Sequence, residues 1–138
     1  KLSRVNNVDA RIMQHNLEYS IFQTDVLRSY EWNPMSYNAG SAINDLIARD
    51  FAPLKERLAN VKGRLEQIPN VIAAAKANLK NPPSVHTKTA IDQNKGVIGL
   101  IKGDLQMFLD QAPEMKADLA PAQAKAVAAL ERRVSFGR

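Results

Sequence analysis

The sequence predicts an all-α protein of about six helices, arranged as an irregular bundle. Apolar residues recur at three- and four-residue spacing in several long segments, which is the period of a helix with one buried face. No stretch shows the strict alternation, hairpin dipeptides or internal repeats that would compete with this pattern. The 138 residues fit one helical domain, or a fragment of one, spanning 1–138.

The first predicted helix covers about residues 3–30. Its apolar positions share one face, and they are Val5, Val8, Ile12, Tyr19, Phe22 and Val26. His15 completes that stripe, so we expect it to be a hydrogen-bonded packing residue of the core. Pro34 disfavours a helical Asn33 and ends the helix. We expect two antiparallel helices to meet at this loop.

Three shorter helices are predicted next, at about 41–49, 53–68 and 70–80. Ser41 is a suitable cap for the first of them, and Pro53 fits the first turn of the second. Pro69 is expected to interrupt the chain between the second and third, because proline removes a helical hydrogen bond. The Asn81-Pro82-Pro83 sequence then ends the third helix.

A long helix is predicted at about 84–111, and a last helix at about 121–135 follows a short one. Gly96, Gly99 and Gly103 lie inside the long helix, where each costs about 1 kcal/mol relative to alanine. Three such costs indicate close backbone packing against a neighbour. The alternative is that the glycines only soften or kink the helix.

Bulk composition narrows the possible functions. No run approaches the roughly 18 apolar residues that a membrane span needs. The net charge of +5 comes from basic residues mixed with acidic ones, and aromatic residues make up only 6% of the chain, so no nucleic-acid groove is predicted. Because the sequence begins at Lys1 inside a helical pattern, it is compatible with removal of a signal peptide or a longer preceding segment.

No catalytic or metal-binding motif is found in the sequence. Neither His15 nor His86 has a second histidine one helical turn away, as many zinc sites have. The chain has no cysteine, no nucleophile elbow and no glycine-rich phosphate loop after a strand. We therefore expect this chain to be non-catalytic and to hold no metal or cofactor by itself.

Two polar clusters remain as candidate binding residues. In the first, His86, Thr87 and Asn94 lie near the start of the long helix, where they either cap and anchor it or border a cleft that binds a ligand. The second consists of Trp32, Asn33 and Tyr37. Here the alternatives are a turn held by a buried aromatic ring and direct contact with a ligand.

Three segments resemble the amino-terminal half of the bacterial family called domain of unknown function 885. They are EWNP..YN at 31–38, ARDFAPLKERLANVKGRLEQIP at 48–69 and ANLKNPPSVHTKTAIDQNKGVIGLI at 77–101. The resemblance implies a longer, mostly helical parent protein, a zinc metallopeptidase similar to carboxypeptidases. Its His-Glu-x-x-Pro-Gly-His segment would lie well downstream and is absent from these residues.

The resemblance thus implies a helical scaffold that forms one wall of a deep substrate channel. The wall candidates are His86, Thr87, Asn94, Trp32, Asn33 and Tyr37, and zinc is expected in the parent alone. The implied partners are the rest of the parent polypeptide and a peptide substrate, in the bacterial periplasm or cell envelope. The alternative is a self-contained bundle that binds a partner helix or small ligand through the Gly96 to Gly103 face.

Overall fold

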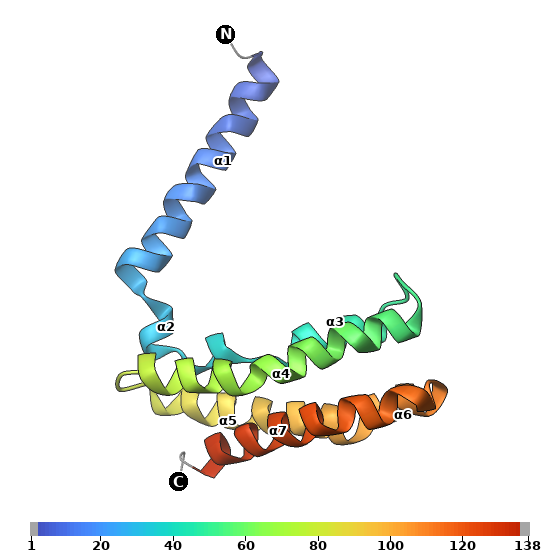
Figure 1. The fold of residues 1–138 in the computed structure, drawn as a ribbon. Coiled ribbons are helices and arrows are strands. Elements are labelled where there is room, and N and C mark those ends of the chain that lie inside the picture. Colours follow the sequence, from blue (N-terminus) through green and yellow to red (C-terminus); the bar gives the residue numbers. More distant parts are fainter. Residues whose placement is uncertain (1–2, 136–138) are drawn as a thin grey trace.

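The computed structural model describes residues 3–135, which are almost entirely helical and contain no strand (Figure 1). This confirms the predicted all-α fold class. The elements in chain order are α1 (Arg4–Phe22), the π-helical turn η1 (Gln23–Leu27), α2 (Ser29–Trp32), the 3-10 turn η2 (Pro34–Tyr37), α3 (Gly40–Ala48), α4 (Leu54–Asn78), α5 (Ser84–Gly99), the π-helical turn η3 (Leu100–Asp104), α6 (Leu105–Gln111), the 3-10 turn η4 (Pro113–Met115) and α7 (Lys116–Ser135).

The core lies between α3, α4, α7 and the long run from α5 to α6. In Figure 1, α4 and α7 lie along one another, and α4 also packs against α3. Apolar side chains on the facing sides of these helices are almost completely buried, among them Ile43, Leu58, Leu65, Ile68, Ile101, Leu105, Leu109, Leu119 and Leu130. Each such burial stabilises the bundle by about 1.5–3 kcal/mol.

The first helix does not join this core, and the predicted antiparallel packing at the following loop is wrong. In Figure 1, α1 leaves the bundle at α2 and runs away from the other helices. None of its residues is buried, so His15 is exposed and is not the core residue that we expected. The turn away from the bundle occurs at Arg28, whose left-handed backbone (φ 47°, ψ 47°) ends the helical run at Leu27.

Proline did not interrupt the helices where we predicted. α4 continues through Pro69, because apolar side chains are buried on both sides of it, including Ile68 and Ile72. Burial of this continuous face outweighs one missing hydrogen bond. Likewise α7 begins at Lys116 and includes Pro121. The described residues therefore form five long helical runs instead of six.

The glycines of the long helix are not packing positions. Apart from its chain neighbours and the adjacent backbone of its own helix, a Cβ atom built on Gly96, Gly99 or Gly103 would meet no atom within 4 Å. The predicted close approach of a neighbouring backbone is therefore wrong. The π-helical turn η3 follows Gly99 directly and includes Gly103, in keeping with the alternative that glycine softens the helix here.

Candidate functional site

The candidate site begins at the sharp corner between α2 and η2. Pro34 follows Asn33 and keeps it extended (φ −100°, ψ 100°). The Asn33 side-chain oxygen then accepts a hydrogen bond from the Met35 backbone N–H at 3.1 Å, which caps η2. Trp32 is fixed by its indole N–H, which donates to the Leu27 carbonyl at 2.8 Å. This local hydrogen bond helps to orient the Trp32 ring.

Tyr37 ties this corner to the end of α4. Its hydroxyl donates to the Tyr30 carbonyl at 2.7 Å and accepts from the Asn78 side-chain amide at 3.1 Å. The backbone N–H of Lys80 donates to the Glu31 carbonyl at 2.6 Å. These contacts hold the α2–η2 corner against the loop that leads into α5.

The start of α5 brings the second predicted cluster to this corner. The imidazole ring of His86 lies against the indole of Trp32, with 5.5 Å between ring centroids and a tilt of 38°. His86 is half-buried, and its Nδ1 atom is buried without a hydrogen-bond partner among the described residues. A buried ring nitrogen without a partner is unusual in a native protein and is suited to a ligand or an ordered water.

Thr87 forms its hydrogen bonds within its own helix and does not cap α5, because no described side chain accepts from the first backbone N–H groups of that helix. Its backbone N–H and its hydroxyl both donate to the Pro83 carbonyl, at 3.0 and 3.1 Å. These bonds stabilise the first turn of α5. The side-chain donor of Thr87 is therefore already used within its own helix.

Asn94 lies farther along the same face of α5, in the core. It is only 2% exposed, and its side-chain nitrogen has no hydrogen-bond partner among the described residues. Eight residues separate it from His86, or about 12 Å along a helix. Asn94 and His86 therefore do not converge on one small binding point.

Asn38 and Gln93 are polar residues near the site that the sequence analysis missed. The Asn38 amide donates to the Gln93 side-chain oxygen at 3.0 Å, and its own oxygen accepts from the Gly40 N–H at 2.7 Å. Together with Asn44 they border a hollow of about 240 Å³ beside Gly96. Asparagine is common in turns that precede a helix, so a turn at Asn38 could have been predicted from the sequence.

Charge at the corner is largely neutralised. Glu31 forms ion pairs with Arg28 at 2.6 Å and with Lys80 at 3.4 Å. The hydrogen bond to Tyr30 and the nearby Glu31 carboxylate raise the pKa of Arg28 above its usual value.

Within residues 3–135, no three or more His, Asp or Glu side chains lie together as a metal ion would need. No described helix is long and apolar enough to cross a membrane.

The fold and the site define a class of protein. It is an all-helical bundle with a projecting amino-terminal helix, and aromatic and polar side chains, including Trp32 and His86, lie together where α2 and η2 meet the start of α5. The chain belongs to the bacterial family described as proteins of unknown function (DUF885), which it matches over residues 1–138. This confirms the family suggested by the sequence. No curated protein matches the chain.

One solved structure is similar over almost the whole chain. It belongs to a candidate lipoprotein of unknown function from Shewanella oneidensis, with 29% sequence identity and a TM-score of 0.89. The match covers 99% of this chain and 26% of that one. The chain thus spans about a quarter of the length of that protein, and the similarity includes the region of α1.

Proposed function

We propose that this chain is a non-catalytic helical scaffold that forms one wall of the substrate channel in a zinc-dependent, carboxypeptidase-like peptidase. The observation that best supports a scaffold role is the exposure of α1 and η1. Ten large apolar side chains in these two elements are 39–68% exposed, far more than an isolated bundle needs. Such a surface is suited to coverage by further protein.

The length of the structural relative supports the same proposal. That protein extends well beyond the part that matches this chain, so there is ample further chain to cover α1. In the proposal, the zinc ligands would lie in this further part, and a zinc ion held there would supply Lewis-acid chemistry for peptide hydrolysis. The present residues position substrate and do not touch the metal.

His86 and Trp32 are the proposed wall residues that contact substrate. Their rings already pack together, and the buried Nδ1 atom of His86 has no hydrogen-bond partner among the described residues. Asn33, Tyr37 and Thr87 use their bonds to hold the corner and the start of α5. We therefore assign them a positioning role.

A location in the bacterial cell envelope is part of the proposal. The relative from Shewanella oneidensis is described as a candidate lipoprotein, and lipoproteins are anchored in envelope membranes. This chain would then work in the bacterial periplasm or cell envelope.

The test is turnover in a longer, active protein that contains this chain. Replacing His86 with alanine should lower kcat/KM by about tenfold or more, because a substrate-positioning contact is lost. Thr89→Ala is the matched control, since Thr89 is exposed on the same turn and bonds only to the Val85 carbonyl. Equal turnover in the two variants, at equal melting temperature, would reject the wall assignment.

A further inference from the structure

The exposed helix α1 carries two apolar stripes on opposite sides. The heptad stripe consists of Val5, Val8, Ile12, His15, Tyr19 and Phe22, and the second stripe consists of Ala10, Met13, Leu17 and Ile21. At about 100° per residue, the two stripes point in nearly opposite directions. Their large apolar side chains are all exposed. A single flat partner cannot cover both sides, so α1 needs two different neighbours.

The heptad stripe has the spacing of a coiled coil. Its members follow one another at intervals of 3, 4, 3, 4 and 3 residues without a break. This is the a and d repeat that lets two helices pack along their whole length. The second stripe has only four members and contains an alanine. The heptad stripe is therefore the better candidate for pairing with another helix.

Charges beside the heptad stripe indicate which helix would fit. The residues just before Ile12 and Tyr19 are Arg11 and Glu18. In an antiparallel coiled coil these flanking positions face the same positions of the other helix. The register that places Ile12 opposite His15 brings Arg11 next to Glu18 of a second copy, and two-fold symmetry repeats the pair. A parallel pair would instead place Arg11 opposite the uncharged Asn16.

We propose that the heptad stripe of α1 binds the heptad stripe of a second copy of this chain in an antiparallel coiled coil. The helix is free to do so because it projects away from α3–α7 (Figure 1) and none of its residues is buried. The second stripe stays available to the remainder of a longer protein, so this inference goes beyond the proposed scaffold role. Three heptads are few, so the association should be weak and reversible.

The test is sedimentation equilibrium of the 138-residue chain over a range of concentrations. The expected mass rises with concentration from 15.3 kDa to twice that value. Arg11→Glu should weaken the association about tenfold or more, because two ion pairs become like-charge contacts. Combining Arg11→Glu with Glu18→Arg should restore it, since the exchanged charges again meet their opposites.

Two further variants test whether the association uses the heptad stripe and not the second stripe. Ile12→Glu should abolish association, while Met13→Glu on the second stripe should leave it unchanged. Neither changes the bundle core, so both proteins should fold. A monomer at all concentrations would overturn the proposal, as would an Arg11→Glu variant that associates normally. Neither outcome affects the turnover test of His86, so the two proposals fail independently.

Discussion

At the scale of single residues, Arg57 holds the end of α3. It is 6% exposed, and its guanidinium donates to the carbonyls of Ile47 and Arg49 at 3.0 Å and of Ala52 at 2.8 Å. The last carbonyls of a helix lack partners within the helix, so these bonds serve as a cap supplied by α4. Its ion pair with Asp50 at 3.0 Å involves a carboxylate that is almost fully exposed.

We predict that Arg57→Met lowers the free energy of unfolding by about 3 kcal/mol, since buried carbonyls lose a charged donor. Asp50→Ala should cost less than about 1 kcal/mol, because an exposed ion pair contributes little. Urea unfolding of both variants measures the difference. Equal losses would show that the ion pair, and not the carbonyl cap, is the stabilising contact.

Asp110 should give the protein a small acid sensitivity. Hydrogen bonds from Lys116 and Gln106 lower the pKa of its carboxyl group. Because the pKa of Asp110 is lower in the folded protein than in the unfolded chain, its ionised carboxylate stabilises the fold at pH values above the pKa of the unfolded chain. This stabilisation is lost as the pH falls through the lower pKa of the folded protein. We predict that Asp110→Asn melts below the wild type at neutral pH and that the gap closes below about pH 4. A gap that persists in acid would contradict this.

At the scale of helices, glycines with different surroundings should respond in opposite ways to alanine. Gly96→Ala should stabilise by about 1 kcal/mol, since its Cβ would meet only open space inside a helix. Gly40→Ala should destabilise by about 1–3 kcal/mol, because its Cβ would lie 2.8 Å from Cγ2 of the buried Val97. Thermal unfolding of the pair tests this. A destabilised Gly96→Ala variant would contradict the open-space explanation.

Helical periodicity predicted most of the elements but not their ends or their neighbours. The apolar stripe through Leu58, Leu65 and Ile68 correctly indicated a buried helix, since one side chain per turn faces the core. The predicted interruption of the helix at Pro69 was wrong, because the helix is held together there by burial of side chains on both sides of the proline. That burial is a tertiary effect. The stripe of α1 has the same period but faces solvent, because periodicity identifies an apolar face without identifying what covers it.

The candidate site was predictable in part. Both polar clusters were found from sequence, and the structure brings Trp32 and His86 together. Separating a local structural role from binding needed the hydrogen bonds themselves: Thr87 uses its hydroxyl within its own helix, whereas Nδ1 of His86 is left without a partner among the described residues. That distinction depends on contacts across the fold, which residue spacing does not encode.

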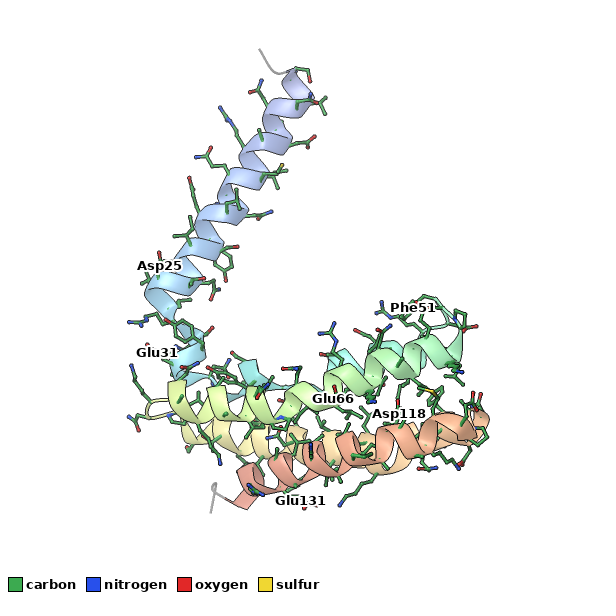
Figure 2. The ribbon with its side chains drawn as sticks, in the orientation of Figure 1. Asp25, Glu31, Phe51, Glu66, Asp118 and Glu131 are labelled. Carbon is green, nitrogen blue, oxygen red and sulfur yellow. The ribbon has the colours of Figure 1, made fainter. Side chains whose placement is uncertain are left out.

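At the scale of the whole molecule, the chain has two parts with different sources of stability. The bundle of α3 to α7 buries its own core, whereas α1 buries nothing (Figure 2). Most helical stability in proteins comes from packing against other elements, so α1, with no buried residue, is expected to be only marginally stable in water. We predict that the 138-residue chain binds a hydrophobic dye and that deleting residues 1–22 removes most of that binding without lowering the melting temperature. Loss of the fold on deletion would contradict a self-sufficient bundle.

The central claim is that further protein covers α1 in a longer parent. Hydrogen exchange tests it most directly, in the dilute 138-residue chain and in the longer protein under the same conditions. We expect fast exchange of α1 amides in the chain alone and at least tenfold slower exchange in the longer protein, with α4 and α7 protected in both. Equally fast exchange of α1 in both proteins would contradict the scaffold account.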